Sequence, residues 1–185
     1  MAKPFMWMAA LPHVSNMMPR LKIVMGVCGV GKSTIAKLLA NATGAAYLDG
    51  DHYHPQANIN KMSQGIALTD DDRWPWLQHF AQSMSGHTGD AVGACSALTK
   101  TYRQWLIKSA GEPILFISLE GSKKLIAQRM SARVDHFMPS SQLDNQLAML
   151  QVPGADEQTI NIDISASSEQ ITNNILEQLA LFNTK

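Results

Sequence analysis

Short apolar runs alternate along this chain with segments whose apolar residues recur at helical spacing. Five of the runs have the length and composition of buried strands, and they cover residues 21–25, 45–49, 91–95, 114–119 and 160–164. The segments between and after them predict helices at 34–40, 73–84, through Tyr102 and Leu106, and at 123–132, 141–150 and 168–182. Strands that alternate with helices indicate an α/β fold, here a five-stranded parallel sheet flanked by helices.

Three segments show neither pattern. Residues 51–72 are polar and predict an irregular connection, and residues 133–140 predict an exposed loop. The first twenty residues carry only a short apolar patch closed by Pro12. A disordered extension or a start codon read too early, with Met17 or Met18 as the true start, is preferred there over a weak signal peptide. We therefore expect one domain over residues 21–185.

Composition narrows the range of partners. Fifteen basic and fifteen acidic residues cancel, so there is no basic excess of the kind that nucleic acids or anionic membranes attract. No apolar run approaches the ~20 residues of a membrane-spanning helix. Cys28 and Cys95 are too few for a disulfide framework. These features predict a cytoplasmic protein with reduced thiols and no nucleic-acid or membrane partner.

The most specific motif follows the first predicted strand. Residues 26–33 read Gly-Val-Cys-Gly-Val-Gly-Lys-Ser, a complete G-x-x-x-x-G-K-S phosphate loop between a strand and a helix. Its glycines let backbone N–H groups point at phosphate oxygens, and the helix N-terminus adds positive charge. Lys32 is expected to reach the β- and γ-phosphates and the Ser33 hydroxyl to bind Mg²⁺. The predicted nucleotide-binding residues of this segment are Gly26, Val27, Cys28, Gly29, Val30, Gly31, Lys32, Ser33 and Thr34.

Two aspartates follow the second predicted strand. Ligands of parallel sheets bind outside the carboxyl ends of the strands, which places Asp49 and Asp51 near the phosphate loop, with Cys95–Ser96 on the same edge. One carboxylate there can hold Mg²⁺ or its water, and the other can accept the proton of a substrate hydroxyl. The alternative is a solvated turn around Gly50.

Other phosphate-loop classes fit the sequence less well. A GTPase requires an Asn-Lys-x-Asp segment, but the only Asn-Lys here, at Asn60–Lys61, is not followed by that aspartate. The short D-x-x-G match at Asp90–Gly93 has little specificity. The strongly hydrophobic strand ending in aspartate that is typical of motor ATPases is absent, and Asp49 at the end of the second predicted strand comes closest to it. A small ATP-dependent kinase is therefore favoured.

The chain resembles the gluconate kinase family, which is related to shikimate kinase and the nucleoside monophosphate kinases. The segments that carry the resemblance occur in family order across residues 21–182. They are Met25–Ser33, Leu48–Pro55, Asn58, Lys61–Met62, Leu68–Leu77, Ala94–Leu98, Lys100, Tyr102–Arg103, His136–Pro139 and Pro153–Glu157.

The resemblance implies a phosphate-loop kinase fold with a short lid and a gluconokinase activity. ATP with Mg²⁺ would phosphorylate D-gluconate to 6-phospho-D-gluconate, a sugar-acid step that feeds the pentose phosphate or Entner–Doudoroff route. Relatives are often dimers, so a homodimer is expected. The resemblance assigns Asp49 to the metal and Asp51 to the substrate as catalytic base.

The resemblance also suggests roles for other polar residues. Arg73 would grip the substrate carboxylate through two hydrogen bonds, unless it only pairs with Asp72 or forms a salt bridge at the start of the helix. His54 would contact the substrate, unless it is only a turn residue. Ser96 would contact the substrate or a water bound to Mg²⁺. Arg129 would stack on adenine, and Arg133 would act catalytically on the transferring phosphate, unless both are solvated.

The remaining polar and aromatic residues have less specific roles in the family pattern. One of Lys100 and Arg103 is expected to face the substrate and the other to be solvated, whereas Trp74 and Trp76 are expected to pack. The chain departs from the family pattern at Thr99, at Leu147–Ala148 and at Val152. A kinase for another small polyol acid such as shikimate, a nucleotide kinase, and a nucleotide-binding regulator without turnover therefore remain alternatives.

Overall fold

A central apolar strand organises the fold. In the computed structural model, which describes residues 18–131 and 140–182, all five residues of β1 (Leu21–Met25) are buried in a sheet of order β2-β3-β1-β4-β5. Its other strands are β2 (Ala46–Asp49), β3 (Ala91–Ala94), β4 (Ile114–Glu120) and β5 (Thr159–Asp163). All four strand pairings are parallel, which confirms the predicted five-stranded parallel sheet.

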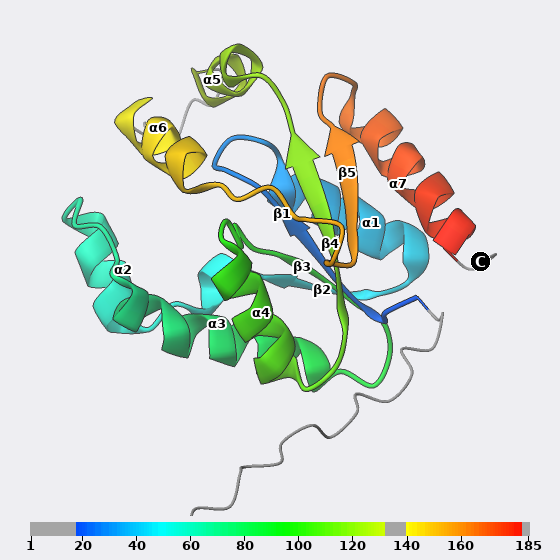
Figure 1. Ribbon diagram of the computed structural model, residues 1–185, viewed down its shortest axis with the longest axis horizontal. Helices are drawn as coiled ribbons and strands as arrows, with labels where there is room; N and C mark the ends of the chain where they lie inside the picture. Colours follow the sequence, from blue (N-terminus) through cyan, green and yellow to red (C-terminus); the bar gives the residue numbers. More distant parts are fainter. Residues whose placement is uncertain (1–17, 132–139, 183–185) are drawn as a thin grey trace, which may run out of the picture.

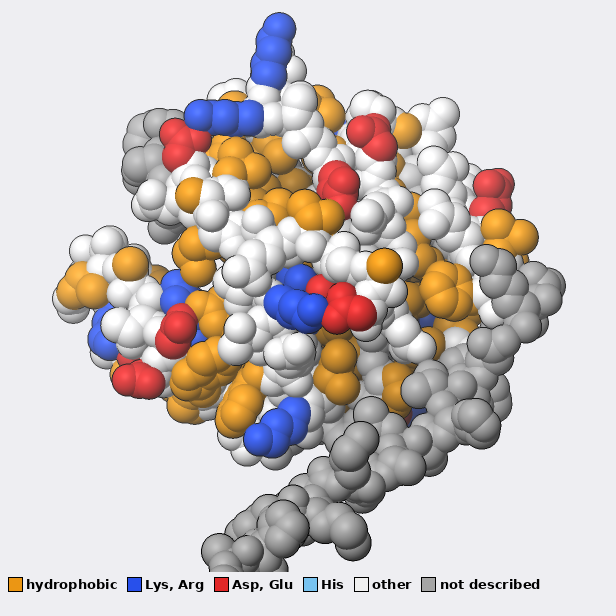
Figure 2. All heavy atoms as spheres, viewed as in Figure 1, with side chains coloured by type: hydrophobic (Ala, Val, Ile, Leu, Met, Phe, Trp, Pro, Cys, Tyr) orange, Lys and Arg blue, Asp and Glu red, His pale blue; other side chains and the backbone are white. Residues whose placement is uncertain are grey.

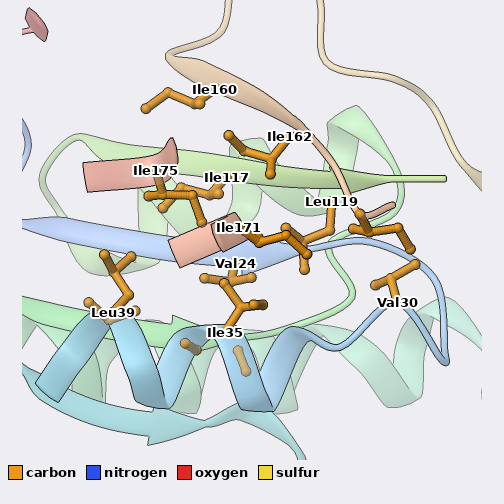
Figure 3. Close-up of a cluster of buried hydrophobic side chains, with 14 of the residues drawn as sticks. Val24, Val30, Ile35, Leu39, Ile117, Leu119, Ile160, Ile162, Ile171 and Ile175 are labelled. Atoms are coloured by element: carbon orange, nitrogen blue, oxygen red, sulfur yellow. The ribbon is translucent and has the colours of Figure 1, made fainter. Parts of the chain in front are cut away.

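Helices cover both faces of this sheet (Figure 1). On one face, α1 (Lys32–Thr43) and α7 (Ser168–Phe182) pack against the strands. Figure 3 shows this core, where Ile35 of α1 and Ile171 of α7 meet apolar side chains of the strands. Burial of such residues removes apolar surface from water and supplies most of the stabilisation of the fold.

The other face packs against α3 (Asp70–Ser85) and α4 (Lys100–Ala110). The approach of α3 is so close that a Cβ atom on Gly93 of β3 would lie 2.6 Å from Cζ of Phe80. A glycine at this position therefore lets the helix sit directly on the sheet.

The segment predicted to be irregular, residues 51–72, contains helical structure. It holds the 3₁₀ helix η1 (Gly50–Tyr53) and the helix α2 (Gln56–Ser63), and α3 begins at Asp70 instead of residue 73. The early start of α3 has a local cause, because the Thr69 hydroxyl and the Asp72 carboxylate form a reciprocal capping box. In α2 only Asn58 is buried, so the helix has no apolar stripe that a periodicity search could find.

The remaining helices, α5 (Lys123–Ser131) and α6 (Ser140–Met149), agree with the prediction to within one residue at each end that is described. Ser122 caps α5, since its hydroxyl accepts a hydrogen bond from the Leu125 N–H at 3.2 Å. Most of the predicted exposed loop and lid, residues 132–139, lies outside the described residues, as does the predicted extension up to residue 17.

The described chain begins with residues that already belong to the fold. Met18 packs against the core, and the Arg20 guanidinium pairs with Glu112 and donates to the carbonyl oxygens of Ser85 and Gly89. These contacts lie just ahead of the predicted domain boundary at residue 21. None of the helices in the described ranges is both long enough and apolar enough to cross a bilayer.

Candidate active site

The loop between β1 and α1 has the backbone conformation expected of a phosphate loop. Gly26, Gly29 and Gly31 have φ angles of 138°, 84° and 101°, which L-residues with side chains rarely adopt. Gly31 is the N-cap of α1, so it offers no side chain to the first N–H groups of the helix, and the first turn of α1 has no acidic residue. These donors and the positive end of the helix dipole suit an anionic ligand.

Lys32 lies between this loop and the two aspartates. Its ammonium donates to the Val27 carbonyl oxygen at 3.0 Å, which folds the side chain back over the loop. Burial lowers the pKa of Lys32, while the negative charge of Asp51, and more weakly that of Asp49, raises it. The cation and both carboxylates are therefore electrostatic neighbours at this edge of the sheet.

Asp49 forms a cluster of oxygen atoms with two hydroxyl groups. Burial raises the pKa of its carboxyl, but hydrogen bonds from Tyr47, from the Asp51 N–H and from Ser33 outweigh burial and lower it. The Tyr47 hydroxyl lies 2.7 Å from Asp49 Oδ2. Ser33 and Asp49, the predicted metal ligands, are thus adjacent. The described residues contain no group of three or more His, Cys, Asp or Glu side chains arranged around a metal site.

Tyr47 was not predicted as a site residue. A signal for it exists, because residues two apart on a strand point to the same face of the sheet, and Tyr47 and Asp49 are such a pair. Burial raises the pKa of the Tyr47 hydroxyl, and so does its hydrogen bond to Asp49, which keeps the phenol protonated and donating.

Asp51 follows on η1 with an exposed side chain. Its N–H donates to Asp49 Oδ1 at 3.2 Å, so the turn around Gly50 that was the alternative interpretation is present. That turn uses the Asp49 carboxylate and leaves the Asp51 carboxylate in solvent beside Lys32. The indole N–H of Trp76 donates to the Gly50 carbonyl oxygen at 2.7 Å and anchors the turn on α3.

His54 lies directly after η1 on the same anchored segment. Its ring stacks on Trp76 with 4.0 Å between ring centroids and 18° between the planes. Burial lowers the pKa of His54, the charge of Asp51 raises it, and the charge of Arg73 lowers it further. Asp51, His54 and Arg73, three of the residues predicted to bind the substrate, are thus electrostatic neighbours.

Arg73 pairs with Asp70 and not with Asp72, so of the two predicted alternatives the Asp72 pair is absent and the helix-start salt bridge is present. Its Nη1 donates to Asp70 Oδ1 and to the Tyr102 hydroxyl, each at 3.1 Å, and the guanidinium lies over the Tyr102 ring. Asp72 instead accepts two hydrogen bonds from Lys61, at 2.7 and 2.8 Å. Helix geometry explains the difference, because Asp70 and Arg73 are one turn apart whereas adjacent residues point in different directions.

Ser96 lies at the predicted edge, since its carbonyl oxygen accepts the Gly26 N–H at 3.3 Å. The next residue, Ala97, has a positive φ of 44°. The Arg103 guanidinium holds this strained turn by donating to the carbonyl oxygens of Ala97 and Leu98, at 3.1 and 3.3 Å. The hydrogen bonds of Arg103 therefore hold the loop that carries Ser96 in place.

The expectation for Lys100 and Arg103 is wrong in one respect. Arg103 neither faces a substrate nor is solvated, because its side chain is fully buried and makes a two-point ion pair with Glu157 at 2.6 and 2.9 Å. Lys100 is partly exposed and pairs with Asp156 at 2.6 Å.

Thr99, a departure from the family pattern, is the N-cap of α4. Cys95 is a packed thiol, since burial raises its pKa to about 12.

The far side of the phosphate loop contacts α5 and α6. Arg129 donates to the carbonyl oxygens of Ile164 and Ala166, at the start of the segment between β5 and α7. Gln146 of α6, which was not predicted as a site residue, accepts the Cys28 N–H through Oε1 at 2.7 Å. Nothing in the local sequence around residue 28 signals a partner 118 positions away. Arg133 lies outside the described residues, so its predicted role stays a prediction.

The outline of the molecule is indented in one place. Figure 2 shows a notch in the outline of the molecule between α2 and α6, with acidic and basic side chains interspersed over the visible face.

Comparison with known proteins agrees with this geometry. A family described as an AAA domain matches residues 21–153. A gluconokinase of Gluconobacter oxydans (strain 621H) is 43% identical over 166 residues, which cover 87% of this chain and 89% of that protein. The crystal structure of a gluconokinase from Sinorhizobium meliloti 1021 matches with a TM-score of 0.80 and 42% identity, over 86% of this chain and 91% of that one. A shikimate kinase from Bacteroides thetaiotaomicron matches with a TM-score of 0.62 but 11% identity, over 86% and 98%, and so shares the fold alone.

Proposed function

This chain belongs to the gluconokinase family, and from that membership we propose that it transfers the γ-phosphate of ATP to the 6-hydroxyl of D-gluconate. The products would be 6-phospho-D-gluconate and ADP. The observation that carries the proposal is one continuous set of charged groups at the sheet edge, from Lys32 through Asp51 to Arg73. Its phosphate-loop end suits ATP, and its other end suits an anionic polyol.

The phosphate side is assigned to the loop and its helix. Lys32 and the N–H groups at the start of α1 would hold the β- and γ-phosphates. The oxygen donors of Ser33 and Asp49 fit Mg²⁺, which takes one or two protein oxygens and completes its shell with water and phosphate. Bound there, Mg²⁺ would neutralise phosphate charge. Arg129, on the α5 side, is proposed to contact the adenine.

The acceptor side is assigned to Asp51. The attacking 6-hydroxyl oxygen would form a bond to the γ-phosphorus while the bond from that phosphorus to the bridging oxygen of ADP breaks. The hydroxyl proton would pass to the exposed Asp51 carboxylate. Phosphoryl transfer of this kind depends mainly on positioning and on stabilisation of charge. Ser96, on the loop fixed by Arg103, is proposed as a further substrate contact.

Arg73 is the cation proposed for the substrate carboxylate. The other candidate cations are paired too, Lys61 with Asp72, Lys100 with Asp156 and Arg103 with Glu157. Arg73 uses only Nη1 for its partners, and within the described residues its Nε and Nη2 make no hydrogen bond. These two nitrogens form the edge that grips a carboxylate with two parallel hydrogen bonds.

A coupled assay of ADP release tests the proposal. Gluconate, glucose, shikimate and nucleoside monophosphates would be compared as acceptors, and gluconate is expected to exceed glucose in kcat/KM roughly ten- to a hundredfold, the effect of one charge-assisted two-point contact. Arg73→Leu should remove most of that difference, and Arg73→Lys should restore part of it.

Each other outcome has a definite meaning. Equal rates with glucose and gluconate would refute the sugar-acid assignment, and preference for shikimate or a nucleotide would replace the substrate. Tight ATP binding without ADP release for any acceptor would identify a regulator without turnover. A gluconate preference unchanged in Arg73→Leu would place the carboxylate at another cation.

Location and assembly are also proposals. The family membership and the balanced charge support a cytoplasmic enzyme that acts on a small molecule, without nucleic-acid or membrane partners. The family resemblance also implies a homodimer. Light scattering coupled to size-exclusion chromatography would give the mass in solution. A mass of one chain, 20.3 kDa, would refute the dimer.

A further inference from the structure

The orientation of a buried amide on α2 can be assigned from its neighbours. Asn58 is 3% exposed, and its Nδ2 lies 2.8 Å from the backbone carbonyl oxygen of Asp72. A carbonyl oxygen can only accept hydrogen bonds, so the amide group that faces it must be the NH₂ group and not the amide oxygen. The contact therefore fixes which way the carboxamide of Asn58 points.

This assignment determines the tautomer of His54. The same NH₂ group lies 3.3 Å from His54 Nδ1. Because both hydrogens of an NH₂ group are donors, Nδ1 has to be the acceptor and cannot carry a proton. In a neutral imidazole the proton then resides on Nε2, on the far edge of the ring from Asn58.

The surroundings of His54 hold the ring in this neutral form. The stacking on Trp76 fixes the plane of the ring, and half-burial lowers the pKa of the imidazole. The charged groups that act on it are Arg73 of α3, which lowers the pKa further, and Asp51 of η1, which raises it. Asn58 of α2 and Trp76 of α3 are neutral. A second proton on Nδ1 would also face the NH₂ group of Asn58 and lose that hydrogen bond.

We propose that His54 is a fixed neutral hydrogen-bond donor whose Nε2–H binds a hydroxyl oxygen of the sugar-acid chain, and that it does not act as the catalytic base. Within the described residues Nε2 makes no hydrogen bond, so it is available to a ligand. This inference rests on the proposed function for the identity of the ligand. It divides the substrate side into three roles: Arg73 binds the carboxylate, His54 recognises a hydroxyl oxygen, and Asp51 receives the proton.

The tautomer can be measured without any activity. A long-range ¹H–¹⁵N NMR spectrum of the histidine-labelled protein at pH 7 should show His54 with a pyrrole-type Nε2 and a pyridine-type Nδ1. The His54→Gln spectrum assigns the signals, and the exposed His79 provides an internal reference. Asn58→Leu should let both tautomers of His54 appear. A proton on Nδ1 in the wild type, or a charged ring at pH 7, would overturn the proposal.

Kinetics test the role. His54→Phe keeps a ring to stack on Trp76 but removes the donor, and it should lower kcat/KM for gluconate roughly 3- to 10-fold, the effect of one neutral hydrogen bond. His54→Gln, which retains an N–H donor, should lose less. The KM for ATP and the shape of the pH profile should stay as in the wild type. A loss of a hundredfold or more in kcat together with loss of the acidic limb would instead identify His54 as the base.

Substrate analogues identify the partner atom. Among monodeoxy gluconates, one should be processed equally well by the wild type and by His54→Phe, because that analogue lacks the hydroxyl that His54 contacts. An unchanged His54→Phe effect on every analogue would refute the hydroxyl contact. If gluconate is no substrate at all, the proposed function fails while the tautomer measured by NMR still stands.

Discussion

Lys32 is the residue on which the phosphate side depends most. Its ammonium lies over the phosphate loop, and ATP would replace the Val27 carbonyl oxygen as its partner. We expect Lys32→Ala to abolish ADP release, because the substitution removes the positive charge that would contact the phosphates of ATP. The circular dichroism spectrum should stay unchanged, because the substitution lies at the phosphate loop. Lys124→Ala, a change at an exposed lysine of α5, is the matched control. Near wild-type turnover of a folded Lys32→Ala protein would show that the site is wrongly assigned.

Asp51→Asn separates the acceptor side from the phosphate side. The substitution keeps the size of the side chain and removes the proton acceptor, so kcat should fall by about a hundredfold or more. ATP affinity by calorimetry should change little. The exposed Asp71 of α3 offers a control in Asp71→Asn, which should behave as the wild type. Normal turnover of Asp51→Asn would leave that residue with only its role in the turn.

Individual side chains were predictable where a motif or a short spacing connects them. The phosphate loop and the Asp49–Asp51 pair follow from their position after strands, and they come together as expected. The pairing of Gln146 with Cys28 and the burial of Arg103 did not follow, because each joins residues more than fifty positions apart. Such contacts depend on how the helices pack, which local patterns do not encode.

The helices and strands were predicted well wherever the apolar pattern along the sequence is clear. The strands lie within one residue of their predicted bounds because each is a compact apolar run. Helix α2 was missed because Asn58 is its only buried residue, and the first turn of α3 was missed although Thr69 and Asp72 have the spacing of a capping box. The capping signal was thus available in the sequence, whereas α2 depends on contacts such as that of Asn58 with Asp72.

The loop that carries Ser96 depends on one buried ion pair of α4. We expect Glu157→Gln to lower the free energy of unfolding at pH 7 by about 3 kcal/mol, because it leaves the buried Arg103 charge without a carboxylate. That corresponds to a melting temperature roughly 6–12 °C lower for a chain of this size. The neighbouring ion pair of Lys100 with Asp156 is exposed, so Asp156→Asn should change the melting temperature by a few degrees at most.

The same pair predicts a pH dependence. The hydrogen bonds from Arg103 hold the pKa of Glu157 below its usual value, although burial opposes them. A carboxyl whose pKa is lower in the folded state stabilises the protein above its unfolded pKa of about 4.3, and this contribution is lost as the pH falls through the folded pKa. The melting temperatures of the wild type and Glu157→Gln should therefore converge as the pH falls below about 4.3 and through the folded pKa of Glu157. A gap that stays constant over that range would contradict the assignment.

Taken as a whole, the molecule gathers its polar chemistry at one edge of a sheet that is otherwise buried. The strand order β2-β3-β1-β4-β5 puts β3 between β1 and β2, so the Ser96 loop lies between the phosphate loop and the Asp49 turn. The alternation of strands and helices predicted the parallel sheet, but it did not predict this order. The order decides which loops become neighbours, and it explains why the residues proposed to bind substrate and nucleotide come from distant segments.

Because the nucleotide would bridge several of these loops, its binding should stabilise the entire fold. A ligand that binds only the folded protein, present at a hundred times its Kd, adds about 2.7 kcal/mol to the free energy of unfolding. For a chain of this size the melting temperature should rise by about 5–10 °C with ATP and Mg²⁺. Lys32→Ala should lose most of that rise, and Asp51→Asn should keep it, because the role proposed for Asp51 is on the acceptor and not on the nucleotide. Scanning calorimetry of the three proteins, each with and without ligand, measures this. Equal rises in all three would show that ATP binds away from the phosphate loop.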